Sequence, residues 1–216
     1  EIKKEELRKD IRALAVKMLE ETIPLKIKTI IIDPGHGGHE HGVIGKGYRE
    51  KDIVLDISKR LRALLDRGSA RGILTRRSDH FVSLRERANF ANRKKGQVFI
   101  SMHIGMRKNI MLYTPVITNP TPEEIKPFLL SRGQEDFIDK SNALADAMTK
   151  AIEEGFGPGM AIRMPLPYSI LSKVEAASLM IELPSFDETD YNEDFKTKVV
   201  NIIYKGLYLY AESETR

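Results

Sequence analysis

The stretch Thr29-Ile-Ile-Ile-Asp-Pro-Gly-His-Gly-Gly38 decides the fold of this chain. Three consecutive isoleucines follow a threonine, and Asp33, Pro34 and Gly35 end the apolar run. A short β-branched run that stops at turn-forming residues predicts a buried strand that enters a loop.

Strands and helices alternate along the chain after this stretch. Apolar residues recur at helical spacing from Ile53 to Leu64. A capping box at Ser83 opens a second helix, whose inner face we expect to carry Leu84, Ala88 and Ala91. This alternation predicts an α/β domain with a largely parallel sheet. The expected elements are a helix from near Asp52 to Gly68, a strand at 72–75, a helix from Ser83, strands at 97–102 and 110–118, a helix at 136–154, a strand at 178–183 and a helix at 195–210.

Length and composition favour one domain with a short appendage. The chain has 216 residues, of which 41% are hydrophobic and 31% charged, as is ordinary for a globular protein. We assign residues 1–26 to a helical segment or linker with an apolar seam from Leu7 to Met18, and residues 27–212 to the catalytic domain. No apolar run is long enough to span a membrane, and the charged N-terminus does not resemble an export signal, so any such signal is absent from this chain.

The stretch from Lys59 to Lys95 is strongly basic, although the net charge of the whole chain is only +4. Basic stretches occur in nucleic-acid-binding proteins, but Phe81 and Phe90 are the only aromatic residues in this one. We therefore interpret it as the solvated faces of two amphipathic helices, and we expect no nucleic-acid partner.

Two of the five histidines follow expected strands. His36 and His103 each come where a strand ends, and ligands bind beyond the carboxyl ends of parallel strands. Each could instead be a hydrogen-bonded structural residue. The chain has no cysteine, so a zinc site would need imidazole and carboxylate ligands, typically three of them with one position left open. Glu50 is the candidate third ligand, although it could also complement a helix dipole. His39, His41 and His80 are interpreted as exposed loop residues.

Glu182 interrupts the apolar run of the last expected strand. A carboxylate in a sheet covered on both faces is costly unless it is paired or bound. Near a metal site it could accept a proton from water and donate it to a leaving nitrogen. Pro184 leaves a second interpretation open, in which Glu182 lies on an exposed edge.

An ordered set of motifs resembles the zinc-dependent N-acetylmuramoyl-L-alanine amidase family of the amidase-3 type. The resemblance covers residues 28–212. The motifs that carry it are Asp33-Pro-Gly-His-Gly-Gly38, Gly42-Val-Ile-Gly45, Glu50-Lys-Asp52, Leu74-Thr-Arg76 with Asp79 and Ser83-Leu84, Ser101-Met-His103 and Ile181-Glu182. On this resemblance His36, Glu50 and His103 fall on the zinc ligands of the family, and Glu182 on its catalytic glutamate.

The resemblance implies a three-layer α/β/α fold with a mostly parallel, mixed central sheet, similar to phosphorylase and hydrolase folds. It also implies hydrolysis of the amide between N-acetylmuramic acid and L-alanine in peptidoglycan, with Zn²⁺ as cofactor and Glu182 as general base. The implied location is the periplasm or the exterior of the cell, and a regulatory protein partner is compatible with it.

Two departures from the family pattern keep alternatives open. Ile104-Gly105 stands where the family commonly has Ala-Asn, and Leu183-Pro184 stands where it has Gly-Phe. The alternatives are a catalytically silent or regulatory wall-binding domain, and a zinc peptidase of other amide specificity. The insertion at 119–133 is a candidate lid.

Overall fold

The computed structural model describes residues 25–117, 120–124, 126 and 133–214. A six-stranded sheet in the order β4-β1-β5-β8-β6-β7 forms its centre. The strands β4, β1, β5 and β8 are mutually parallel, and β6 pairs antiparallel with β8 but parallel with β7. The strands are β1 (Thr29–Pro34), β2 (Ile44–Gly45), β3 (Tyr48–Arg49), β4 (Arg71–Leu74), β5 (Val98–Ile104), β6 (Ile110–Thr114), β7 (Ala161–Pro165) and β8 (Ala177–Leu183).

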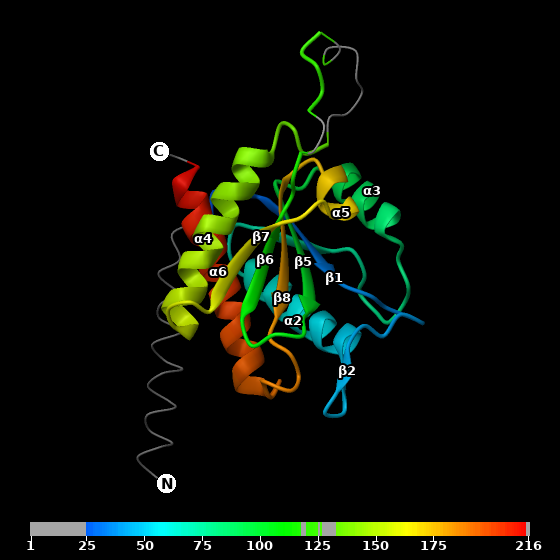
Figure 1. Ribbon diagram of the computed structural model, residues 1–216, viewed down its shortest axis with the longest axis vertical. Coiled ribbons are helices and arrows are strands. Elements are labelled where there is room, and N and C mark those ends of the chain that lie inside the picture. The colour runs from blue at the N-terminus through cyan, green and yellow to red at the C-terminus, as the bar shows by residue number, and fades with distance from the viewer. Residues whose placement is uncertain (1–24, 118–119, 125, 127–132, 215–216) are drawn as a thin grey trace.

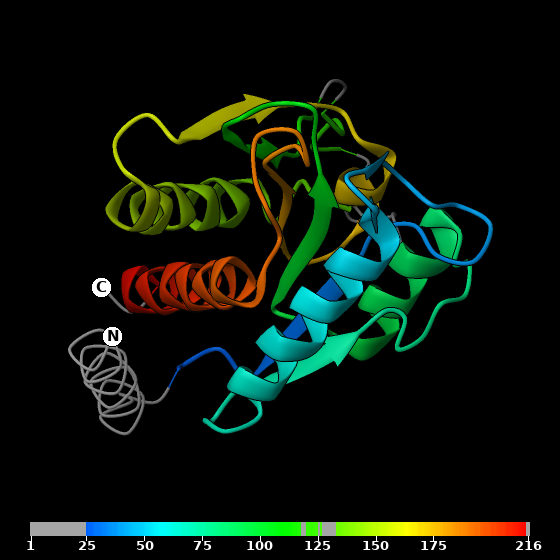
Figure 2. The same ribbon diagram turned by 90° about the horizontal axis from the view of Figure 1, so that it is seen from below.

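Helices cover both faces of the sheet, so the expected three-layer α/β/α fold with a mostly parallel, mixed sheet is confirmed (Figures 1 and 2). The helices α2, α4 and α6 pack on one face, and the shorter α3 and α5 pack together on the other. The helices are α2 (Glu50–Leu65), α3 (Leu84–Lys94), α4 (Ile138–Phe156), α5 (Ser169–Lys173) and α6 (Glu193–Ser213). None of these described helices is long and apolar enough to cross a membrane.

Alternation along β1 explains why three consecutive isoleucines, Ile30 to Ile32, can all be buried in this strand. Ile30 and Ile32 belong to the larger core beneath α2, α4 and α6, whereas Ile31 belongs to the smaller core beneath α3 and α5. Successive side chains of a strand point to opposite faces, so a strand covered on both sides needs a continuous apolar run.

Several expected boundaries were wrong by a few residues. β5 continues to Ile104, so His103 lies inside the strand and not beyond its end. β6 ends at Thr114 instead of 118, because Pro115 cannot donate to the ladder. The helix expected from near Asp52 already begins at Glu50.

The expected inner face of α3 was partly wrong. The capping box at Ser83 is present, and Ala88 is buried as expected. Leu84, however, is 55% exposed, and Arg87 takes the inner position. The reason is a buried carboxylate on β1, which Arg87 reaches from α3.

Some predictions fall outside the described residues. The apolar seam from Leu7 to Met18 lies there, so the division between a segment at 1–26 and a domain at 27–212 stays a prediction. The insertion at 119–133 is described only in part, so its role as a lid also stays a prediction.

Candidate metal centre

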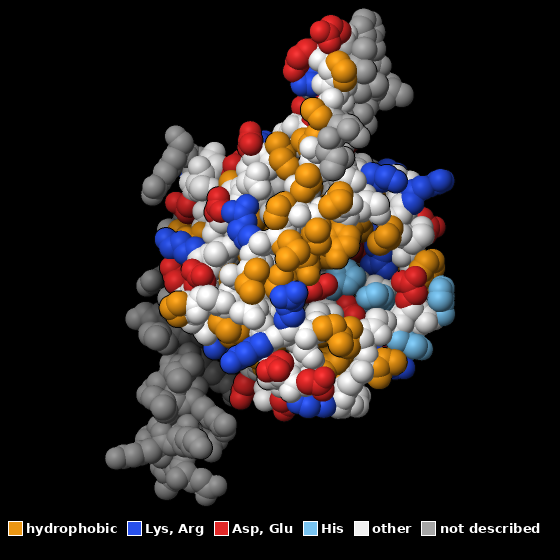
Figure 3. Space-filling view, viewed as in Figure 1, with side chains coloured by type: hydrophobic (Ala, Val, Ile, Leu, Met, Phe, Trp, Pro, Cys, Tyr) orange, Lys and Arg blue, Asp and Glu red, His pale blue; other side chains and the backbone are white. Residues whose placement is uncertain are grey.

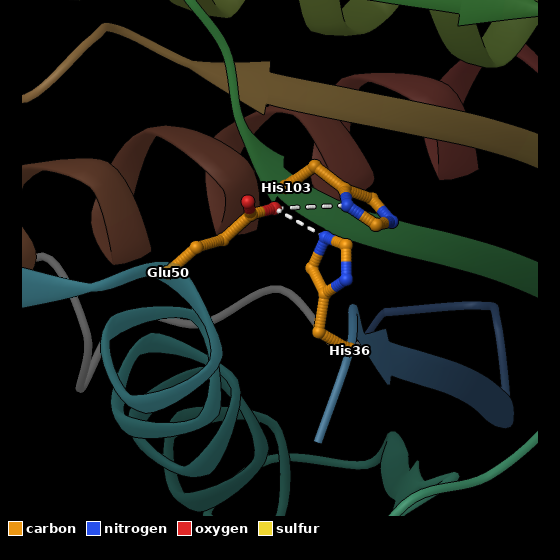
Figure 4. A group of neighbouring side chains, drawn as sticks. All are labelled: His36, Glu50 and His103. Atoms are coloured by element: carbon orange, nitrogen blue, oxygen red, sulfur yellow. Dashed lines mark hydrogen bonds and ion pairs between the residues drawn. The ribbon is translucent and has the colours of Figure 1, made fainter. Parts of the chain in front are cut away.

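His36, Glu50 and His103 come together at the carboxyl ends of β1 and β5. His36 follows β1, Glu50 opens α2, and His103 is the next-to-last residue of β5. Their ligand atoms all lie within 4.8 Å of one another, and this is the one such group of metal-binding side chains in the described part of the chain. Figure 4 shows the three side chains pointing toward a common centre.

The distances fit a small tetrahedral metal ion. Glu50 Oε1 lies 3.2 Å from His36 Nε2 and 2.9 Å from His103 Nδ1. Ligand atoms at zinc-bond lengths in a tetrahedron are separated by about 3.4 Å, so little movement would be needed to bind. Two imidazoles and one carboxylate also match the ligand preference of zinc, with a fourth position left open.

Glu50 is held as an anion at the centre of the group. It is only 2% exposed, and its Oε1 accepts from the Ile104 amide while its Oε2 accepts from the Val43 amide. Burial opposes ionisation, but hydrogen bonds with His103 and His36 outweigh it, so the pKa of Glu50 lies well below its usual range. The partners of this buried carboxylate are two imidazoles and two backbone amides, and imidazoles can share a metal ion with it.

The Glu50 carboxylate in turn acts on His36. The hydrogen bond with Glu50 is the largest effect on this imidazole and raises its pKa, against the opposing effect of burial. Glu40, with Oε2 at 3.7 Å from His36 Nδ1, acts in the same direction. The pocket therefore attracts positive charge, whether a proton or a metal ion.

Glycines make room for the three side chains. A Cβ at Gly35 would lie 2.3 Å from Cε1 of His103, and one at Gly42 would lie 2.3 Å from Oε2 of Glu50. His36 itself has a left-handed backbone with φ of 57°, which a side chain adopts only at a cost. The loop therefore needs glycine at these positions, because the side chains of His103 and Glu50 approach its backbone too closely for a Cβ atom.

Two buried arginines hold this loop. Arg76 donates to the carbonyls of Pro34 and Gly35, and Arg87 donates to those of Pro34 and His36. Arg87 also pairs with the buried Asp33 at 2.8 Å. Burial and the neighbouring positive charge disfavour the protonated form of Arg76. Burial has the larger effect and the charge of Arg87 the smaller, and together they lower the pKa of Arg76 to about 10.

The sequence interpretation missed both arginines, because it assigned their basic stretch to solvated helix faces. Arg87 lies three residues after Leu84 and four before Ala91, so its helical spacing from two apolar residues was the available signal. Arg76 belongs to one of the motifs but has no periodic context.

Glu182 lies in the same cleft as the three candidate ligands. It pairs in register with His103 across the β5–β8 ladder, and the cleft of about 400 Å³ that they line also includes Val43, Met106 and Arg107. β8 lies between β5 and β6, so the alternative that Glu182 lies on an exposed sheet edge was wrong. In Figure 3 some of the pale-blue histidine side chains lie beside an apolar area of the surface, and others lie toward the right-hand edge of the molecule.

The other histidines lie away from this group. His39, His41 and His80 are exposed, as expected for loop residues. His39 packs against Phe81 with ring centroids 4.5 Å apart, and His80 contacts the hydroxyl of Ser78.

Comparison with known proteins places this architecture in a family. The model of the family described as N-acetylmuramoyl-L-alanine amidase (Amidase_3) matches residues 30–207. The chain is 45% identical over 84 residues to the probable N-acetylmuramoyl-L-alanine amidase AmiB of Haemophilus influenzae. The matching segment makes up 38% of this chain and 19% of AmiB. It is also 44% identical over 80 residues to the amidase LytC of Bacillus subtilis. That matching segment makes up 37% of this chain and 16% of LytC. The chain thus spans about a fifth or less of the length of these relatives.

Solved structures share the fold. The amidase AmiC2 of Nostoc punctiforme superposes with a TM-score of 0.69 at 24% identity, covering 86% of this chain and 97% of that one. An N-acetylmuramoyl-L-alanine amidase from Clostridium difficile 630 gives a TM-score of 0.70 at 23% identity, covering 87% and 98%. At this level of identity the likeness extends to the fold alone.

Proposed function

This chain belongs to the N-acetylmuramoyl-L-alanine amidase family, and from that premise we propose that it hydrolyses the amide between N-acetylmuramic acid and L-alanine in peptidoglycan. The observation that supports the proposal best is the convergence of His36, Glu50 and His103 beside Glu182 in one cleft. Because peptidoglycan is the substrate of the proposed reaction, the proposed place of action is the cell envelope, in the periplasm or outside the cell.

In this proposal His36, Glu50 and His103 hold a zinc ion. A zinc ion there would supply Lewis-acid chemistry, which activates water and polarises a carbonyl. The chain's own contribution is to orient the ligands: the Ile104 and Val43 amides fix the two oxygens of Glu50, and the buried arginines fix the backbone of His36. Ligand orientation of this kind is part of what sets metal affinity.

Glu182 is the proposed general base. Its carboxylate lines the cleft from the strand next to that of His103. It would accept a proton from the attacking water and donate it to the amide nitrogen as the bond to L-alanine breaks. The products are a free lactyl carboxylate on the sugar and a stem peptide with a free amino terminus.

The test is the release of stem peptides by the purified, zinc-loaded chain. Incubation with peptidoglycan should release peptides that begin with L-alanine, as identified by mass spectrometry, and chelation should abolish the release. Glu182→Ala should still bind about one zinc per chain but be inactive. Turnover by this variant would contradict the assigned base, and release of different fragments would indicate a zinc peptidase of other specificity.

Wild-type protein that binds zinc and peptidoglycan but releases nothing would support a silent wall-binding domain instead. The departures at Ile104-Gly105 and Leu183-Pro184 are the observations that favour this alternative, because both lie next to proposed site residues.

A protein partner is also proposed for this chain. One solved structure that shares its fold is the CwlD amidase of Clostridioides difficile in complex with the GerS lipoprotein. Co-purification of the chain with proteins of the cell envelope would test whether it too has a partner.

A further inference from the structure

The strand β6 brings a tyrosine to the carboxylate of Glu182. In the antiparallel β6–β8 ladder Glu182 pairs with Met111, and Tyr113 pairs with Met180. Tyr113 is therefore the diagonal neighbour of Glu182 on the same face of the sheet, a separation that aromatic side chains can bridge. Its hydroxyl donates to Glu182 Oε2 at 2.8 Å, and the tyrosine is only 8% exposed.

The other side of Oε2 is closed by backbone. A Cβ at Gly105 would lie 2.9 Å from this oxygen, so a side chain at this position would displace the carboxylate. Gly105 is one of the positions at which the chain departs from the family pattern. Within the described residues the Tyr113 hydroxyl donates the only hydrogen bond to the carboxylate of Glu182, and Oε1 receives none. The carboxylate thus has one anchored oxygen and one that is left for chemistry.

The tyrosine is itself fixed and stays protonated. The ring of Tyr168 packs on it edge to face, with centroids 5.4 Å apart and an interplanar angle of 90°. Burial, followed by the hydrogen bond to Glu182, raises the pKa of Tyr113 to about 12. The hydroxyl therefore remains a donor over the whole range in which an amidase would work.

We propose that Tyr113 is a positioning residue that anchors Oε2 of Glu182 through its hydroxyl, so that Oε1 faces the water and the leaving nitrogen. This inference rests on the proposed amidase function. Gly105 completes the arrangement by leaving the space that the anchored oxygen occupies. The role is one of orientation, because a base must lie within hydrogen-bond reach of the proton that it removes.

The experiment compares Tyr113→Phe with the wild type on peptidoglycan fragments. Loss of a hydrogen bond to a charged group should lower kcat about tenfold, whereas KM and zinc content should stay unchanged. Tyr204→Phe, on α6, is the matched control and should leave kcat within about twofold. In the variant Glu182→Asp the shorter side chain no longer reaches the Tyr113 hydroxyl. Adding Tyr113→Phe to this variant should therefore lower kcat by less than about twofold.

Two further measurements keep the outcomes separate. Gly105→Ala crowds Oε2 while leaving Tyr113 intact, and it should also lower kcat with an unchanged KM, so the inference stays testable if Tyr113→Phe does not fold. Nuclear magnetic resonance of ring-labelled tyrosine reads the contact without turnover, because the Tyr113 resonance should move in Glu182→Gln.

Equal kcat for Tyr113→Phe and the wild type would overturn the inference while leaving the amidase function in place. Equal losses in the wild-type and Glu182→Asp backgrounds would also overturn it, because Tyr113 would then act on the substrate directly. An inactive wild type would refute the proposed function, and the positioning role would fall with it.

Discussion

On the β1 side of the cleft, the backbone of residues 34–36 receives four hydrogen bonds from two buried arginines, whereas on the β8 side the Glu182 carboxylate receives one from the described part of the chain, donated by Tyr113. The backbone of the proposed ligand His36 is thus held by a buried network that includes Asp33, which is 1% exposed. The proposed base is held by one hydroxyl at the rim of an open cleft.

The difference matches what each side must do. Metal ligands have to stay within about 0.2 Å of their bond lengths, so fixing the backbone of His36 in several directions is an advantage. A general base has to take a proton from one atom and deliver it to another, and an oxygen that no protein donor fixes is better placed to reach both. One anchored oxygen on Glu182 provides orientation and still leaves movement.

The largest effect should come from breaking the network beneath His36. Arg87→Met leaves the charge of Asp33 buried without its partner and removes the donors to two loop carbonyls. Unpairing a buried charge costs about 3–5 kcal/mol, which urea unfolding would measure as a fall in the free energy of unfolding.

The matched control is Arg85→Met on the same helix. Arg85 is exposed, so its replacement should change stability by less than about 0.5 kcal/mol. Equal effects of the two substitutions would mean that the buried network contributes nothing beyond an ordinary surface arginine, and the contrast between the two sides would disappear.

The network was also the part of the site that the sequence could not predict. Apolar periodicity predicted β1, β5, β8 and α2, because burial on one face or two leaves a repeating pattern. The convergence of His36 and His103 followed from the rule for the carboxyl ends of parallel strands. The helical spacing of Arg87 was a local signal of burial, but the carbonyls that it and Arg76 reach lie far away in the chain, and neither residue carries a local sign of those partners.

Short elements at the far edge were missed for a related reason. β7 and α5 were not expected, and β7 has residues that are only half-buried or exposed. Among the described residues β7 is an edge strand that pairs with β6 alone, so its conformation depends on that partner more than on its own pattern. Tyr113 was likewise not recognised, because its relation to Glu182 requires the antiparallel register of β6.

The next effect should appear in metal affinity. Gly35→Ala places a methyl group against the ring of His103, whose hydrogen bond with Glu50 limits how far the ring can move away. Misorienting one ligand typically lowers metal affinity about 10–100-fold, which competition with a chelator would measure. Gly68→Ala is the control, because its methyl group would meet only ordinary contact at 3.6 Å. Unchanged zinc affinity in Gly35→Ala would mean that the proposed zinc ligands can adjust their positions, which contradicts the rigid support inferred for the β1 side of the cleft.

The smallest effect is expected in the stability of the fold at acid pH. Its size measures how much the charge of Asp33 contributes to the network with the buried arginines. Burial opposes the charge of Asp33, but Arg87 and the hydroxyls of Thr75 and Ser101 outweigh it and lower its pKa below the usual range. A carboxylate with a depressed folded pKa stabilises the fold above its unfolded pKa, and this stability is lost as the pH falls through the folded value. The wild type should therefore lose stability below pH about 4 more steeply than Asp33→Asn, by up to about 1 kcal/mol per pH unit.

Urea midpoints measured from pH 6 to pH 3 would test this. Asp33→Asn should be the less stable protein at pH 6, and the two curves should converge as the acid titrates Asp33 in the wild type. Parallel curves would mean that Asp33 contributes shape and hydrogen bonds but no charge. The two arginines would then hold the His36 loop without a counter-ion, as Tyr113 holds Glu182 with a neutral hydroxyl, and the two sides would differ only in the number of hydrogen bonds.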